Sequence, residues 1–448
     1  MALGRAGASR VGAVLAAAVF TALFTALAVA PAGAQGAAPF EPSPESSAPT
    51  AFRATASQAA TSRAGTSQER TSQERTSQEG TSEERVSAGE PQAPAPLQNP
   101  VLKFFAETRL TGLIDTYYSY NFNTPNTPCS VADGVEIFNC LHAFDVAHNA
   151  FRLSFAELAL EKKPTSASRL GYRLDVDYGT GAALVSRFEP GGPTPLQRHI
   201  QQAYVSYLAP AGNGTLQVDF GKFVTPAGFE VIESKDDWNY SRGLLFTLAI
   251  PRYHQGLRVA YSPGDRATIT GFLVNGWNNS GENNGAKSVG VQFIGKPSTA
   301  LAVTVNYIGG PEIPDDNADW RHLFDIVTTY TVSPTVTIAL NYDLGKELST
   351  TWQGGAAYLR YQPNAWFALT PRYELFNDHD GWALTGQNPQ EFTLTGEFKH
   401  AGGLVIRVEY RGDLTQDPFF VKNTTEQVKT QKSLTVALLY AFSSKKAR

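Results

Sequence analysis

The feature that most constrains this chain is a strict alternation of apolar and polar residues in segments of about ten residues. In 170–178, Leu, Tyr, Leu, Val and Tyr alternate with Gly, Arg, Asp and Asp. Comparable alternation recurs in 301–307, 336–343, 392–399, 404–411 and 434–442. Successive side chains of a strand point to opposite faces, so each segment is predicted to be a strand with one apolar and one polar face. A tilted strand of roughly 9–11 residues crosses a bilayer.

The connections between these segments alternate in length. Long connections are predicted near 123–148, 180–196, 224–253, 275–286, 310–320, 344–350, 376–389 and 412–430. Short ones are predicted near 163–168, 209–214, 262–265, 296–299, 332–335, 362–364 and 400–403. Alternating short and long connections are typical of outer-membrane barrels. We therefore expect an all-β fold, a transmembrane antiparallel β-barrel of about 16 strands with both termini in the periplasm.

Aromatic residues at the strand ends separate this prediction from a soluble β-sandwich. Tyr178 and Tyr410 end strands on the long-connection side, and Tyr261 and Phe442 end strands on the other side. Two such rings are expected where a barrel meets the two membrane interfaces. A sandwich, in which the apolar faces of two sheets meet, would explain neither these rings nor the alternating connections.

Residues 1–34 are predicted to be a cleaved signal peptide. Arg5 and Arg10 precede an apolar run over 11–30, and Ala-Gly-Ala at 32–34 fits a small-residue cleavage site. The alternative is an uncleaved transmembrane helix, because the run is long enough to span a bilayer.

Residues 35–100 differ in composition from the rest of the chain and are predicted to be a disordered spacer. Five-residue units, including two copies of TSQER, follow one another from Thr61, and large apolar residues are scarce. Such a segment cannot bury enough apolar surface to offset the entropy of ordering. A tether to the cell wall or to a periplasmic partner is one interpretation, and a solvated tail is the other. Residues 101–448 are then the barrel.

A family resemblance rests on four stretches of the barrel region. These are FGKFVTPAGFE at 220–230, NYSR at 239–242, PRYHQG at 251–256 and LIDTYY at 113–118. They resemble the OmpL-like β-barrel porin family over roughly 105–442. The resemblance implies an outer-membrane location and pore activity, and it brings no catalytic residues. The repeat-bearing spacer is not part of the family pattern.

The polar strand faces are predicted to point into the lumen, because an Arg or Lys facing lipid at mid-membrane costs roughly 2–4 kcal/mol. A 16-strand barrel is too wide for its wall side chains to fill, so the longest connection, 224–253, is predicted to fold inward and form the constriction. Its segment 244–250 is apolar, and the alternative is that this segment is a further strand. The pore-lining and constriction candidates are Glu230, Lys235, Asp236, Asp237, Arg242, Arg252, Arg173, Asp175, Asp177, Arg372, Glu374, Arg407 and Glu409. For each charge the alternative role is an ion pair that braces the wall.

The two cysteines, Cys129 and Cys140, are predicted to form a disulfide in the first long connection. No metal site, cofactor motif or nucleophile motif stands out, so no cofactor and no enzyme activity are predicted. A net charge of −4 gives no support to nucleic-acid binding. The predicted function is passive diffusion of small hydrophilic solutes or ions through an outer-membrane porin. The alternatives are a plugged structural or adhesive barrel and a lipid-hydrolysing barrel. Expected partners are outer-membrane lipid, the barrel-assembly machinery and further copies of the chain.

Overall fold

The structure is a computed structural model that describes residues 99–189, 192, 194–383 and 386–444. The predicted signal peptide, 1–34, and the predicted spacer up to residue 98 lie outside the described residues. No helix among the described residues is long and apolar enough to cross a membrane.

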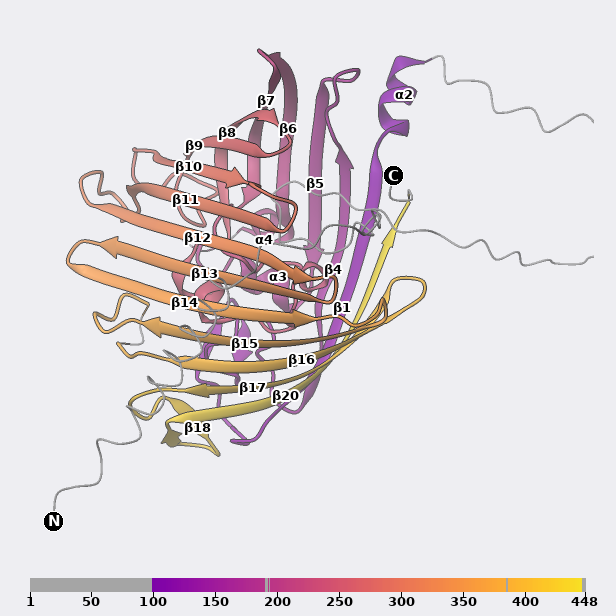
Figure 1. Cartoon of the computed structure of the whole chain (residues 1–448). Coiled ribbons are helices and arrows are strands. Elements are labelled where there is room, and N and C mark those ends of the chain that lie inside the picture. The colour runs from indigo at the N-terminus through magenta and orange to yellow at the C-terminus, as the bar shows by residue number, and fades with distance from the viewer. Residues whose placement is uncertain (1–98, 190–191, 193, 384–385, 445–448) are drawn as a thin grey trace, which may run out of the picture. The chain divides into compact units, whose positions relative to one another are not determined.

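Sixteen antiparallel strands form one closed barrel, as predicted. Each strand pairs with its neighbour in sequence, and β1 closes the sheet by pairing with β20 from Thr111 opposite Ser443 to Asn121 opposite Ser433. Figure 1 shows this closure where the indigo β1 lies beside the yellow β20. The barrel strands are β1 (Arg109–Asn121), β4 (Ala150–Lys162), β5 (Leu170–Tyr178), β6 (Ile200–Ala211), β7 (Gly214–Val224), β8 (Tyr253–Gly264), β9 (Ala267–Val274), β10 (Ser288–Gly295), β11 (Leu301–Pro311), β12 (Trp320–Ser333), β13 (Val336–Glu347), β14 (Thr350–Tyr361), β15 (Phe367–Asn377), β16 (Gln390–His400), β17 (Leu404–Leu414) and β20 (Thr430–Ser443).

The connections carry the remaining elements, and one prediction about their lengths is wrong. The predicted long connection at 344–350 is a two-residue turn at 348–349, because β13 runs to Glu347 and β14 begins at Thr350. Leu348 makes this turn with a φ of 53°. The other elements are α2 (Pro100–Ala106), the hairpin β2 (Ser130–Ala132) and β3 (Val135–Ile137), α3 (Thr180–Val185), α4 (Pro195–His199), the 3-10 helix η1 (Ser234–Asp236), the π-helical turn η2 (Leu245–Ala249), and the hairpin β18 (Phe420–Lys422) and β19 (Glu426–Val428).

Burial along the strands is the reverse of that in a soluble sheet. On β20 the apolar Leu434 and Val436 are 40% and 44% exposed, whereas the intervening Thr435 is 2% exposed. The apolar side chains therefore form the outer face of the barrel and the polar ones its inner face. An outer face of this kind is stable only against an apolar solvent such as lipid, which agrees with a transmembrane barrel.

A β-bulge in β4 changes which residues of this strand face the lumen. Phe155 lies opposite Asp115 on β1, but Leu153 lies opposite Thr116, so Ser154 has no partner in the ladder. Ser154 and Phe155 are both 1% exposed and both face inward. The extra residue shifts the alternation. Phe151 and Leu153, before the bulge, face outward, whereas Phe155 and Glu157, after it, face inward.

The apolar core lies inside the barrel and is built mostly from connections. It includes Phe144 from the β1–β4 connection, Leu184 from α3, and Phe229 and Phe246 from the β7–β8 connection. A soluble sandwich would have its core between two strand faces, so this location of the core excludes the sandwich.

Candidate functional site: the lumen and its inward-folded loop

Residues 225–252, which we call the lumenal loop, connect β7 to β8 and fold into the barrel as predicted. The apolar segment 244–250 is not a strand. It forms η2, whose Leu245 and Phe246 are buried. The indole nitrogen Nε1 of Trp352 on β14 donates to the carbonyl of Ala249 at 3.1 Å. The loop therefore packs its apolar part against the wall, as expected of an inward-folded loop.

The lumenal loop reaches the wall opposite to its own strands. In the strand order of the barrel, β15 and β16 lie half a circumference away from β7 and β8. Arg372 on β15 donates to Glu230 Oε1 at 2.5 Å and to the carbonyl of Ser241 at 2.6 Å. Asn239 Nδ2 donates to Thr395 Oγ1 on β16 at 2.7 Å. These contacts make the loop cross the lumen.

Two charged residues of β17 hold the middle of the loop through its backbone. Arg407 donates to the carbonyls of Ser234, Asn239 and Asp237 at 2.6, 3.0 and 2.5 Å. Glu409 accepts from the backbone nitrogens of Tyr240 and Ser241 at 2.6 and 2.9 Å. Charge-assisted hydrogen bonds of this kind are stronger than neutral ones. These wall charges therefore act as docking groups for the loop.

A third attachment joins the loop to β1. The carboxylate of Asp115 accepts from Ser234 Oγ at 2.6 Å and from the Tyr240 hydroxyl at 2.8 Å. Asp115, Ser234 and Tyr240 are all at most 2% exposed. Buried polar groups that satisfy one another in this way fix a single position for the loop.

The β1–β4 connection also folds inward and contains the predicted disulfide. Cys129 and Cys140 are bonded to each other. His142 Nδ1 lies 2.6 Å from Asp145 Oδ2, and its Nε2 lies 3.4 Å from Asp413 Oδ2 on β17. Burial and the nearby charge of Arg411 lower the pKa of His142, but the carboxylates of Asp145 and Asp413 outweigh them and hold this pKa above its ordinary value.

Most of the predicted pore-lining charges are buried in contacts with other parts of the protein. Among the candidates of the loop, Lys235 and Asp236 are the most exposed, and they pair with each other. Arg252 donates to the carbonyl of Leu184 and lies near three phenylalanine rings. Arg173 pairs with Asp175 at 2.8 Å, and its side chain is 25% exposed. The candidates that are 6% exposed or less are Glu230, Asp237, Arg242, Arg252, Asp175, Asp177, Arg372, Glu374, Arg407 and Glu409.

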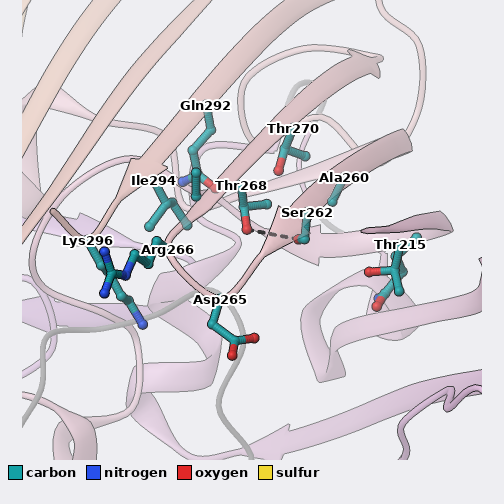
Figure 2. Close-up of a pocket in the computed structure, with 12 residues that line it drawn as sticks. Thr215, Ala260, Ser262, Asp265, Arg266, Thr268, Thr270, Gln292, Ile294 and Lys296 are labelled. Atoms are coloured by element: carbon teal, nitrogen blue, oxygen red, sulfur yellow. Dashed lines mark hydrogen bonds between the residues drawn. The ribbon is translucent and has the colours of Figure 1, made fainter. Parts of the chain in front are cut away.

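Open space remains on the other side of the lumen, near the short turns. A cavity of about 190 Å³ lies between β7, β8, β9 and β10 (Figure 2). A smaller cavity of about 70 Å³ lies beside it along β4 to β7, and Gln217 lines both. The larger cavity is lined by Thr215, Gln217, Ala260, Ser262, Asp265, Arg266, Ala267, Thr268, Thr270, Gln292, Ile294 and Lys296.

The lining of the larger cavity is mostly short and uncharged. Ser262 and Thr268 face each other across β8 and β9 with hydroxyl oxygens 2.9 Å apart (Figure 2). The positively charged residues Arg266 and Lys296 lie in two neighbouring short turns. The backbone nitrogen of Lys296 donates to the carbonyl of Arg266 at 2.8 Å. A wall of hydroxyl and amide groups can exchange hydrogen bonds with water or with a hydrophilic solute.

The predicted pore-lining candidates do not include two lumenal carboxylates, Glu157 and Glu233, or the neighbouring Gln201. The bulge at Ser154 hides Glu157 from an alternation test, because the residue follows the apolar phase of its strand. Glu233 belongs to a loop, where no period indicates which side chains face the wall. The approach of Glu233 to β6, where Gln201 donates to it, is a tertiary feature with no local signal.

Comparison with known proteins agrees with this architecture. The chain matches the family described as "Putative beta-barrel porin-2, OmpL-like" over residues 107–442. A search of curated proteins found no significant match.

Several solved structures are similar to this chain. The outer membrane channel DcaP of Acinetobacter baumannii is similar with a TM-score of 0.50 and 13% identity, covering 75% of this chain and 97% of that one. An anion-selective porin from Comamonas acidovorans gives a TM-score of 0.48 and 10% identity over 75% and 99% of the two chains. OmpF of Salmonella typhi, in complex with daunomycin, gives 0.48 and 13% over 75% and 97%. At such identities, structural likeness concerns the fold alone. The family match, however, spans most of the sequence, and the chain belongs to the OmpL-like beta-barrel porin-2 family.

Proposed function

We propose that this protein is a bacterial outer-membrane porin through which small hydrophilic solutes or ions diffuse passively. Family membership supports the outer-membrane location and a porin role. The observation that carries the proposal is the reversed polarity of the wall, with apolar side chains outside and polar side chains inside. Water and hydrophilic solutes can pass through a polar lumen, whereas the hydrocarbon core of the bilayer excludes them.

The path that we propose runs between the lumenal loop and the wall formed by β4 to β10. Both cavities lie along this wall near the short turns, whereas the loop touches β6 through Glu233 and crosses the lumen to β15 and β17, where Arg372 and Arg407 hold it. The loop is then the constriction, and the predicted charges of β15 to β17 hold it in place. Arg173, with Asp175 and Asp177 on the same strand, faces the open side.

Several predictions about the rest of the protein remain part of this proposal. We infer that residues 1–34 direct export and are cleaved, that 35–100 form a flexible spacer in the periplasm, and that both ends of the barrel face the periplasm. Recognition of the last strand by the barrel-assembly machinery and association with further copies of the chain belong to the same proposal. The chain is proposed to act without a cofactor and without catalysis.

A plugged structural barrel is the second candidate, and a specific observation favours it. The lumenal loop is held by many buried hydrogen bonds, and the apolar cluster around Phe144 and Phe246 fills part of the lumen, with ring centroids 5.7 Å apart. A constriction this well anchored could close the pore fully. Both candidates share the fold, so conductance separates them.

The test is single-channel conductance of the refolded barrel in a planar bilayer. One variant replaces 226–251 by a short Gly-Ser linker. A matched control removes 420–428, a mostly exposed hairpin in the β17–β20 connection. We expect discrete ohmic steps from the wild type, larger steps without the lumenal loop, and unchanged steps in the control. Silence from a folded, heat-modifiable wild-type barrel would refute the porin and leave the plugged barrel.

A further inference from the structure

Three carboxylates meet where the lumenal loop touches β4, β5 and β6. Glu157 on β4 lies directly opposite Asp177 on β5 in the strand register. Glu233, on the loop, accepts a hydrogen bond from Gln201 Nε2 on β6 at 3.0 Å. Glu157, Asp177, Glu233 and Gln201, which we call the carboxylate cluster, are 5%, 1%, 9% and 3% exposed. Four separate elements thus bring acceptor oxygens to one buried place.

None of the three acids forms an ion pair within the part of the chain that the structure describes, and three acceptor atoms of the cluster have no hydrogen-bond donor there. These atoms are Glu157 Oε2, Asp177 Oδ1 and Gln201 Oε1. The nearby Asp175 differs, because it pairs with Arg173 at 2.8 Å. The acids of the cluster also repel one another electrostatically. Buried carboxylates that lack both a cation and a donor are strongly unfavourable.

The two nearest lysines are engaged elsewhere. Lys222 donates from Nζ to the carbonyl of Gln197 at 3.2 Å and lies 4.1 Å from the ring centre of Tyr253. Lys235 pairs with the neighbouring Asp236. These lysines make the surroundings less negative, but neither supplies a proton to an oxygen of the cluster in the described contacts. A positive charge is therefore needed from outside the chain.

We propose that the carboxylate cluster is a cation-binding site of the pore, which takes a small inorganic cation such as K⁺ that keeps part of its water. Oxygen donors suit hard cations. No three His, Cys, Asp or Glu side chains of the described residues converge closely enough to chelate a metal ion. The inference rests on the proposed function and adds to it a preference for cations.

The position of the cluster beside the open side of the lumen supports this role. Glu161, one of the residues that line the smaller cavity, lies on the same inner face of β4 as Glu157. Arg173, which is partly exposed, lies on β5 between this cavity and Asp177. An ion that enters from the short-turn end would therefore meet the cluster where the loop narrows the lumen. Fixed charges at a narrow, poorly screened point set the ion preference of a channel.

The first test measures the reversal potential of single channels in a KCl gradient. The test variant carries Glu157→Gln, Asp177→Asn and Glu233→Gln. The control carries Glu136→Gln, Asp315→Asn and Asp417→Asn, which remove the same charge from exposed loop positions. We expect a wild-type channel that prefers K⁺ and a permeability ratio of K⁺ to Cl⁻ that falls about tenfold in the test variant. Equal ratios in the test and control variants would overturn the inference.

A second measurement does not depend on conductance. The melting temperature of the refolded barrel is compared in KCl and in N-methylglucamine chloride at equal ionic strength, because the bulky organic cation cannot enter the cluster. We expect K⁺ to raise the melting temperature of the wild type and of the control but not that of the test variant. A wild type that responds to pH and not to K⁺ would show that the acids share a proton, and the inference would fail. If K⁺ raises the melting temperature of the wild type but the protein gives no conductance in bilayers, the proposed porin function is wrong and the proposed cation site is supported.

Discussion

Replacing Gly243 by alanine should loosen the lumenal loop without changing any charge. A Cβ atom at Gly243 would lie 2.1 Å from Oε1 of Glu374 on β15. This carboxylate is fixed, because it accepts from the Tyr358 hydroxyl at 2.9 Å and from the Leu245 backbone nitrogen at 3.0 Å. Either the carboxylate or the loop must therefore move, and in both cases buried hydrogen bonds break.

The size of the effect follows from those contacts. A hydrogen bond to a charged group contributes about 1.5–3 kcal/mol, and an overpacked site costs about 1–3 kcal/mol. Loss of one of the two bonds to Glu374, with partial relaxation, should lower the free energy of unfolding by about 2–4 kcal/mol. Gly271→Ala is the matched control, because a Cβ at Gly271 on β9 has no atom within 4 Å.

The assay is urea unfolding of the two variants in detergent micelles, followed by tryptophan fluorescence. Trp352 is a useful reporter, since its indole donates to the carbonyl of Ala249 in the loop. Gly271→Ala should leave stability unchanged or slightly raised, because alanine restricts the unfolded chain more than glycine does. If Gly243→Ala and Gly271→Ala unfold within about 0.5 kcal/mol of each other, the loop is not packed tightly against β15 at Gly243.

Three further perturbations test other attachments of the lumen. Reducing the Cys129–Cys140 disulfide, or replacing both cysteines by serine, should lower the free energy of unfolding by about 2–3 kcal/mol. Urea unfolding with and without reductant measures this, and equal midpoints would contradict a stabilising disulfide. The pKa of His142 is raised in the folded protein, so its stabilising effect is fully present below about pH 6.5 and is lost as pH rises through the raised value. The unfolding free energy of His142→Asn should thus depend less on pH than that of the wild type, and parallel curves would rule out the ionised histidine. Tyr240→Phe removes the hydroxyl that donates to Asp115 at 2.8 Å, so it should lower the free energy of unfolding by about 1–3 kcal/mol and raise amide hydrogen exchange in the loop. Unaltered exchange would show that this contact does not hold the loop.

The strands could be predicted from the sequence because their signal is local. A strand in a barrel has lipid on one side and a polar lumen on the other, so its burial repeats every two residues. The alternating segment 170–178 coincides with β5, and 404–411 lies within β17. The two-residue turn at 348–349 was missed because the polar end of β13 continues the strand beyond its apolar residues, which end at Leu344.

The contacts of the lumenal loop could not be predicted in the same way. Arg372 and Glu230 pair across 142 positions in the sequence, and Arg407 reaches the carbonyl of Ser234 across 173. Alternation shows that Arg372 faces inward but not which group it meets. The inward folding of the loop was predictable from its length and its apolar segment, because neither water nor an empty lumen would accommodate them.

The charges of the lumen divide into two classes according to what each one meets. On β15 to β17, Arg372, Arg407 and Glu409 bind the loop, so removing one of them leaves buried loop groups without their hydrogen-bond partner and should weaken the fold. On β4 and β5, Glu157 and Asp177 have no such partner, and removing them relieves repulsion. A barrel of this width needs the first class to keep its constriction rigid, while only the second class is free to attract an ion. Substitutions on β15 to β17 should therefore change stability and gating noise, and substitutions at the two acids should change ion preference while the barrel stays as stable as before or becomes more so.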